Sequence, residues 1–191
     1  MTKAKYKVLI LTGDAGESLE VLYPYQRLLE EGYEVHIAAP SRKTIQTVVH
    51  DFVPGFDTYT EKPGYLVKAD LAFKEVNPED YVALVLPGGR APEYIRNDPD
   101  VQRIVRHFFE QNKPVAVICH APLILAAAGV LRGRKVSAYP ALKPDVENAG
   151  GIFIDGAAVV DGLMVSARAW PDHPQWMREF IRILKSKYPP E

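Results

Sequence analysis

The sequence has little of what marks a secreted, membrane-bound or nucleic-acid-binding protein. It contains one cysteine, so no disulfide can form within the chain, which favours a reducing compartment. No apolar run approaches the length of a membrane span, and the formal net charge of -1 gives no positive field for nucleic acid or an acidic membrane. Near the basic start of the chain, the apolar run 8–11 is too short for a signal peptide. We expect a cytoplasmic protein that binds neither nucleic acid nor membrane.

The sequence also lacks the motifs of common cofactor sites. Its five histidines are not paired at metal-ligand spacing, and a lone cysteine forms no thiolate cluster. Neither the G-x-G-x-x-G pattern nor a P-loop is present. We therefore expect no metal, no nucleotide and no other cofactor.

What is present is an alternation of short apolar runs with amphipathic stretches. The runs predict strands at 7–11, 34–39, 81–86, 115–118, 134–138, 153–154, 159–160 and 163–166. Apolar residues at helical spacing predict helices at 22–29, 101–109, 123–128 and 176–184. This order predicts an α/β fold, with a mostly parallel sheet covered by helices on both faces.

Residues 41–67 interrupt the alternation, because they are rich in Thr, Gly, Pro and aromatics and lose helical periodicity. We expect one domain over residues 1–191, with a β-hairpin-type excursion at about 41–67. The aromatic residues of this excursion either wall a pocket or form a subunit contact. They are Phe52, Phe56, Tyr59 and Tyr65.

Three informative stretches, 13–17, 87–93 and 119–120, follow expected strands. Open parallel sheets bind ligands at the carboxyl ends of their strands. We therefore expect these stretches to meet in one site.

Cys119 and His120 lie between a strand and a helix, with no relaxed turn residue to join them. So tight a reversal places one side chain at its apex, as in a nucleophile elbow. A helix N-terminus lowers the pKa of a thiol, and an N–H there, with one from the Gly88-Gly89 turn, could hold an oxyanion. A buried structural thiol fits Cys119 equally well, and His120 acts as a base only if the elbow bends the backbone. The residues alone leave both interpretations of Cys119 open.

The remaining candidates each have a plainer explanation. Glu17 either caps the first helix or places its carboxyl group beside the sulfur, whereas Asp14 and Glu20 are expected to be solvated or capping. Arg90 could hold an anionic group, although a surface position is the simpler expectation. Likewise, Glu93 fits a helix cap.

His173 either contacts the substrate or starts the last helix.

Three stretches carry a family resemblance: "VLILTGDAGESLEVLYPYQRLLEEGYEVHIAAP", "DYVALVLPGGRAPEYIR" and "NKPVAVICHAPLILAAAGVLRGRKVSAY". They resemble the PfpI/ThiJ superfamily, which is similar to class I glutamine amidotransferases. The resemblance runs from Lys7 to about Leu184 and implies a flavodoxin-like three-layer sandwich with a nucleophile elbow.

The resemblance also implies a role for each site residue. Cys119 would be the nucleophile, His120 the general acid/base and Glu17 the carboxyl group that contacts the thiol. The backbone N–H groups of Gly89 and His120 would form the oxyanion hole. Glu93 matches an acidic residue that PfpI-type proteases supply across a subunit interface, so a homo-oligomer (dimer, trimer or hexamer) is expected.

The leading function implied is a glyoxalase III-like conversion of methylglyoxal or glyoxal to lactate or glycolate, or a related deglycase activity, through a hemithioacetal on Cys119. The alternatives are an intracellular cysteine peptidase acting on peptide substrates, and an oxidative-stress sensor or chaperone with an accessible, low-pKa thiol. The segments "HDFVPGFDTYTEKPGY" and "ARAWPDHPQWM" resemble the plant-type glyoxalase branch. A longer loop over the site favours a small substrate.

Overall fold

The computed structural model describes residues 3–190 and is built around a seven-stranded sheet. The strand order is β10-β11-β7-β6-β1-β2-β5, and every neighbouring pair is parallel except β10–β11. The strands are β1 (Lys7–Leu11), β2 (Glu34–Ala39), β5 (Leu71–Ala72), β6 (Ala83–Leu86), β7 (Val115–Ile118), β10 (Val159–Asp161) and β11 (Met164–Ala167).

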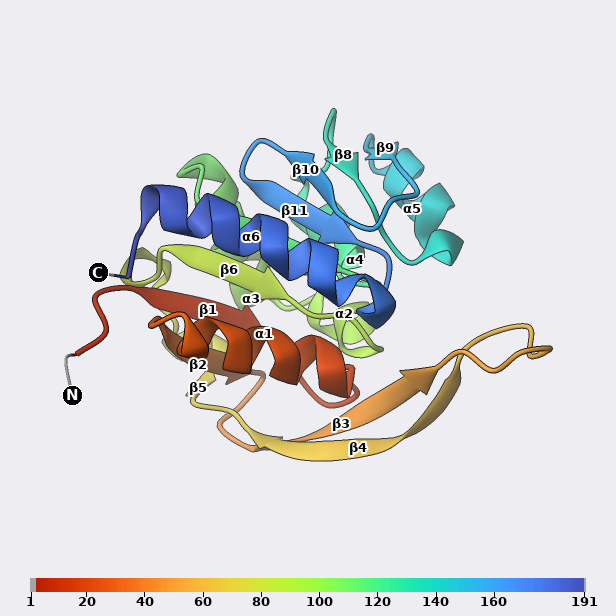
Figure 1. Cartoon of the computed structure of the whole chain (residues 1–191), viewed down its shortest axis with the longest axis horizontal. Helices are drawn as coiled ribbons and strands as arrows, with labels where there is room; N and C mark the ends of the chain where they lie inside the picture. The colour runs from red at the N-terminus through yellow and green to blue at the C-terminus, as the bar shows by residue number, and fades with distance from the viewer. Residues whose placement is uncertain (1–2, 191) are drawn as a thin grey trace.

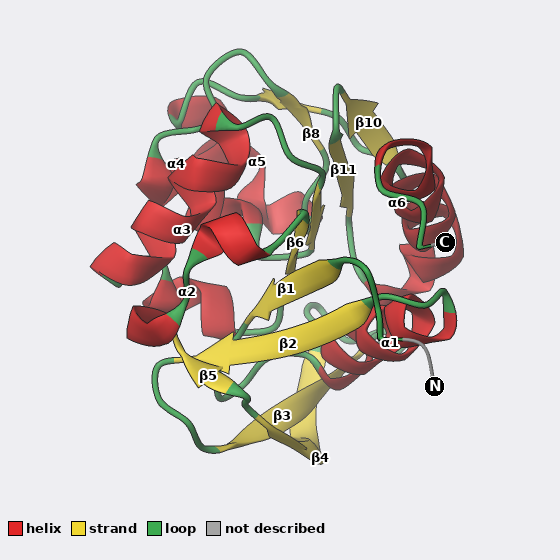
Figure 2. Cartoon of the chain, turned by 90° about the vertical axis from the view of Figure 1, so that its left-hand side faces the viewer, coloured by secondary structure: helices red, strands yellow, loops and turns green. Residues whose placement is uncertain are grey.

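Helices cover both faces of this sheet (Figures 1 and 2). One face carries α1 (Ser18–Glu30) and α6 (His173–Lys187). The other carries α2 (Ala91–Ile95), α3 (Pro99–Glu110), α4 (Pro122–Ala128) and α5 (Lys143–Asn148). The central strands β1, β6 and β7 are apolar throughout because both of their faces are buried. The predicted flavodoxin-like sandwich is confirmed.

The hairpin formed by β3 (Thr44–Asp51) and β4 (Thr60–Lys68) lies outside the main sheet and projects from the body of the molecule (Figure 1). Its base is joined to the loop after β1 by backbone hydrogen bonds. The Ala15 N–H donates to the Gln46 carbonyl at 2.8 Å, and the Val48 N–H donates to the Gly16 carbonyl at 2.9 Å. The hairpin is therefore fixed beside the carboxyl end of β1.

Two short strands differ from expectation. The runs at 134–138 and 153–154 become β8 (Lys135–Val136) and β9 (Ile152–Phe153), which pair only with each other. Runs this short do not specify a partner strand, so the sequence could not exclude them from the main sheet. Single turns of 3₁₀ helix occur at Phe73–Glu75, Pro78–Asp80, Pro140–Leu142 and Trp170–Asp172.

Among the residues that the structure describes, none of the helices combines the length and the apolar character that a membrane span requires.

Candidate active site

The loops after β1, β6 and β7 meet at one edge of the sheet, and two glycines permit their close approach. A Cβ on Gly88 would lie 2.5 Å from the Cβ of Cys119 and 2.6 Å from a carboxylate oxygen of Glu20. Gly89 has a φ of 79°, and a Cβ there would collide with the backbone of Ala15. Only glycine fits at these positions without a shift of the surrounding loops.

Cys119 stands at the apex of a strained elbow. Its φ is 61°, a conformation that costs a non-glycine residue roughly 1–3 kcal/mol. Backbone hydrogen bonds hold it there, because its N–H donates to the Ala167 carbonyl at 3.1 Å and its carbonyl accepts from the Tyr139 N–H at 3.0 Å. The surrounding fold therefore imposes the strain, as is typical of functional residues.

The Cys119 thiol is nearly inaccessible, with 4% of the residue exposed. Burial raises the pKa of the thiol well above its usual value, and the neighbouring Glu20 raises it further. The backbone N–H groups of Gly89 and His120 point at the sulfur and lower the pKa, but they do not offset the burial. The expected accessible, low-pKa thiol is therefore wrong, because desolvation outweighs the helix N-terminus.

Glu20, rather than Glu17, is the carboxyl group within hydrogen-bonding reach of the thiol. Its Oε1 accepts from the Gly88 N–H at 2.9 Å, and the residue is 1% exposed. Burial, followed by the nearby Glu17 charge, raises the pKa of Glu20 well above the usual range. The expectation that Glu20 would be solvated or capping is wrong.

Glu17 has the capping position that the sequence offered as its simpler explanation. Its Oε2 accepts from the Glu20 N–H at 2.8 Å at the start of α1. Its Oε1 is buried and has no hydrogen-bond partner. When ionised, Glu17 therefore raises the pKa of Cys119 and that of Glu20 through its charge.

The buried Glu17 makes the stability of the fold depend on pH. Burial raises its pKa to about 7, so between about pH 4.3 and 7 the folded protein keeps a proton that the unfolded chain releases. This stabilisation is complete below about pH 4.3 and is lost as the pH rises to about 7. Burial lowers the pKa values of His120 and His173 to about 4, so their contribution to stability has the opposite pH dependence and is lost as the pH falls toward 4.

In the difference in free energy of unfolding between the wild type and Glu17→Gln, the histidine contributions cancel and the contribution of Glu17, including its effect on the pKa of Glu20, remains. We expect the variant to gain on the order of 3 kcal/mol relative to the wild type between about pH 4.3 and 7. Urea unfolding at a series of pH values measures this. A difference that does not vary with pH would contradict the buried, protonated Glu17.

His120 presents a neutral imidazole to the thiol. Its Nδ1 lies 3.0 Å from the Cys119 Sγ, so the elbow does turn the two neighbouring side chains toward each other. Burial, followed by the charge of His50, lowers the pKa of His120 to about 4. The ring stacks on Tyr139, with a centroid separation of 5.0 Å. His120 is therefore placed to accept the thiol proton.

The expected oxyanion donors separate into two roles. The Gly88 N–H is engaged by the Glu20 carboxyl, whereas the N–H groups of Gly89 and His120 are directed at the sulfur. These last two donors are the ones placed to stabilise negative charge that develops next to Cys119.

Arg90 and Glu93 line a cavity of about 290 Å³ beside His120. The Arg90 guanidinium is already engaged, because its Nε and one terminal nitrogen donate to both oxygens of Glu61 at 2.8–3.0 Å. Glu61 is therefore the partner that orients Arg90 in this structure. Glu93 is exposed on α2 and shares the cavity with His120 within the same chain.

His173 does not line this cavity. It is 6% exposed and lies stacked between the rings of Tyr23 and Trp176, with centroid separations of 5.1 and 5.4 Å. The expected substrate contact is wrong, because the start of α6 packs inward against α1.

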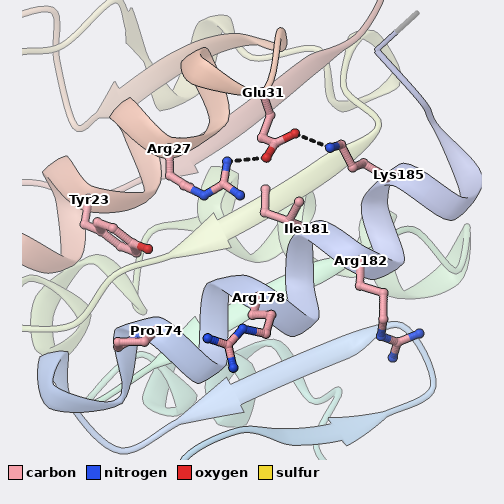
Figure 3. A pocket seen from close by; sticks show the side chains of 8 residues that line it. All are labelled: Tyr23, Arg27, Glu31, Pro174, Arg178, Ile181, Arg182 and Lys185. Carbon is pink, nitrogen blue, oxygen red and sulfur yellow. Dashed lines mark ion pairs between the residues drawn. The ribbon is translucent and has the colours of Figure 1, made fainter.

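A larger hollow of about 430 Å³ lies between α1 and α6 (Figure 3). Glu31 is paired there with Arg27 and Lys185, and Arg182 is paired with Glu179. Its charges are thus largely matched, and it contains no nucleophile. Its lining residues are Tyr23, Arg27, Glu31, Pro174, Arg178, Ile181, Arg182 and Lys185. Of these two spaces, only the smaller cavity is lined by a residue that contacts Cys119, which is His120.

Comparisons with known proteins agree with this geometry. Residues 6–183 match the family model described as the DJ-1/PfpI family. The chain is 51% identical over 179 residues to "Deglycase PH1704" from Pyrococcus horikoshii, covering 94% of this chain and 99% of the relative. It is 36% identical to "Protein/nucleic acid deglycase 2" from Escherichia coli, covering 93% of this chain and 97% of that protein.

A crystal structure from Anabaena variabilis contains DJ-1/ThiJ/PfpI-like and ferritin-like domains. It superposes with a TM-score of 0.85 at 29% identity, covering 94% of this chain and 48% of that one. Sequence, fold and site therefore agree, and the chain belongs to the DJ-1/PfpI family.

Proposed function

We propose that the chain is a cofactor-independent cysteine enzyme that acts on 2-oxoaldehydes such as methylglyoxal, or on the adducts they form with amino and thiol groups. The observation that carries this proposal is the Cys119 Sγ at a strained elbow, 3.0 Å from Nδ1 of a neutral His120. The buried Glu20 adds a carboxyl group of raised pKa beside the sulfur. Both relatives are named as deglycases, and this supports the same class of substrate.

The first step joins the sulfur to the aldehyde carbon. His120 accepts the thiol proton while the sulfur attacks, and the carbonyl π electrons move to oxygen. The N–H groups of Gly89 and His120 stabilise this oxygen, which then takes the proton from His120 to give a hemithioacetal. An adduct of methylglyoxal with an amine reaches the same hemithioacetal when the C–N bond breaks and the amine leaves.

The second step moves one proton between neighbouring carbons. Glu20, in its ionised form, removes the proton from the thioacetal carbon, giving an enediolate, and returns it to the adjacent carbon, while the hydroxyl proton passes from the oxygen of the first carbon to that of the second. The raised pKa makes this carboxylate a stronger base than an exposed glutamate. The product is a thioester of a 2-hydroxy acid, which water cleaves to lactate and the free thiol. The net change is methylglyoxal plus water to lactate, without an external oxidant.

A test of the function compares three substrates for the purified protein and for Cys119→Ala, without added thiol or metal. They are methylglyoxal, its adduct with a lysine-containing peptide, and a fluorogenic peptide. We expect lactate from the first two with the wild type alone. Peptide cleavage without lactate would overturn the proposal.

The second candidate is peptide hydrolysis by the same thiol. It is favoured by Glu93, which lines the same cavity as His120. The burial of Cys119 opposes it, because an extended peptide needs access to the sulfur. The expected homo-oligomer, in which Glu93 acts across an interface, stays a prediction. Loss of peptide cleavage in Glu93→Ala would support this candidate.

The oxidation-sensor alternative needs a thiolate that peroxide can reach. The Cys119 thiol is buried and its pKa is raised, so the site favours it least.

A further inference from the structure

The β3–β4 hairpin contributes one wall of the active site. Although the hairpin projects from the body, His50 at the end of β3 is 3% exposed. Tyr59 packs on it with a centroid separation of 4.3 Å. The edge-on contacts of the Tyr59 ring are with His120 at 5.6 Å and with Tyr139 at 5.3 Å. The rings of Tyr59 and Tyr139 thus pack on His120, whose Nδ1 contacts the Cys119 sulfur.

A chain of polar contacts fixes Tyr59 in this position. Glu61 lies between Arg90 and His50, accepting two-point hydrogen bonds from the guanidinium and lying 2.8 Å from His50 Nε2. Bidentate pairs between arginine and a carboxylate fix geometry more strongly than single contacts. On the other side of the hairpin, the Trp170 Nε1–H donates to the His50 carbonyl at 2.7 Å. The hairpin is thus fastened to the loop after β6 and to the segment before α6.

The space left beside His120 is small. The cavity of about 290 Å³ has Tyr59 on one side and Leu123 and Leu142 among its other lining residues. This is near the lower limit of the cavities that hold drug-sized ligands, roughly 300–1,000 Å³. Removal of the Tyr59 ring would enlarge this cavity toward His50, on which the ring packs.

We propose that Tyr59 is the specificity-determining residue of this site. Its ring, held by the contacts from Arg90 through Glu61 to His50, admits the short carbon chain of methylglyoxal and excludes 2-oxoaldehydes with a ring or a long chain. Glu61 is a positioning residue, since it acts through Tyr59. This inference rests on the proposed function, and it limits the 2-oxoaldehyde part of the substrate to a short carbon chain.

The first test compares kcat/KM for methylglyoxal and for phenylglyoxal. In Tyr59→Ala, we expect the preference to shift toward phenylglyoxal by about tenfold or more, mainly through a lower KM for the larger substrate. Tyr59→Phe keeps the ring and should keep the wild-type ratio. Glu61→Gln should shift the ratio in the same direction by less. The matched control is Tyr65→Ala, which removes a 74% exposed ring from the same hairpin and should leave the ratio unchanged.

The second test does not require turnover. Cys119 is the only thiol in the chain, so its alkylation by N-methylmaleimide and by N-phenylmaleimide compares two sizes of reagent with the same chemistry. In Tyr59→Ala, the rate of alkylation by N-phenylmaleimide should rise relative to that by N-methylmaleimide by about tenfold or more. Glu61→Gln should again give a smaller rise in this ratio. Circular dichroism and thermal melting establish whether each variant is folded. If Tyr59→Ala does not fold, Glu61→Gln decides whether Tyr59 sets the size of the substrate.

The outcomes separate the two claims. If no variant turns over a 2-oxoaldehyde but the maleimide ratio shifts as expected, the proposed function fails and the role of Tyr59 stands. If turnover is present and neither ratio changes in a folded variant, the role of Tyr59 is overturned and the function stands. A shift of equal size in Tyr65→Ala would also overturn it, because the effect would then belong to the hairpin as a whole.

Discussion

Replacing Glu20 by glutamine is expected to lower kcat on methylglyoxal by roughly a hundredfold or more. The glutamine oxygen can still accept from the Gly88 N–H, so the loop keeps its geometry. What the variant loses is a group that can exchange a proton beside the sulfur. The loss should appear in kcat more than in KM, because the missing step follows binding. Initial rates of lactate formation, measured over a range of substrate concentrations, give both constants.

Glu17→Gln is the matched control for this experiment. Glu17 also has a buried carboxyl group, but its Oε2 caps α1 and its Oε1 has no hydrogen-bond partner. We expect a loss of less than about tenfold, since glutamine still offers a capping oxygen and Glu20 remains in place. Equal losses in the two variants, or a larger loss in Glu17→Gln, would return the proton-transfer role to Glu17.

Cys119→Ser is expected to lower kcat/KM by roughly 10⁴-fold or more. A hydroxyl is a weaker acid than a thiol, and the burial that raises the pKa of Cys119 would penalise a charged serine oxygen as well. The serine keeps the size and polarity of the side chain, so circular dichroism and the melting temperature should change little. Activity within tenfold of the wild type would mean that Cys119 is not the nucleophile.

The sequence predicted the parts of the fold that depend on long or strongly apolar runs. The runs at 34–39 and 115–118 appear with the predicted bounds as β2 and β7. The three stretches that form the site were found because the carboxyl ends of β1, β6 and β7 are neighbours in a parallel sheet. The family resemblance is confirmed as well.

The choice between Glu17 and Glu20 could not be made from the sequence. The two carboxyl groups are three residues apart at the start of one helix, and both are compatible with capping or contact. The decision depends on how α1 sits against the Gly88 turn, where the Gly88 N–H donates to Glu20 and brings its carboxyl group beside Cys119. The sequence left His173 open between a substrate contact and the start of the last helix for a similar reason, since the contact between α1 and α6 decides which way its ring faces.

For the β3–β4 hairpin, the sequence could not predict which aromatic residue lies at the site. Its aromatic residues were recognised as a pocket wall or a subunit contact, but their spacing does not say which ring reaches His120. Tyr59 does so because Glu61, two residues later on β4, pairs with Arg90 from a loop 29 residues away. Such long-range pairing leaves no local signal in a single sequence.

The most direct test of the nucleophilic role is mass spectrometry of the protein and of its peptides after rapid mixing with methylglyoxal and an acid quench. The wild type, and Glu20→Gln with its slowed proton transfer, should carry a covalent adduct on the peptide that contains Cys119, and Cys119→Ala should carry none there. Lactate formation at the wild-type rate by Cys119→Ala, or turnover by the wild type with no adduct at any quench time, would contradict catalysis through this thiol.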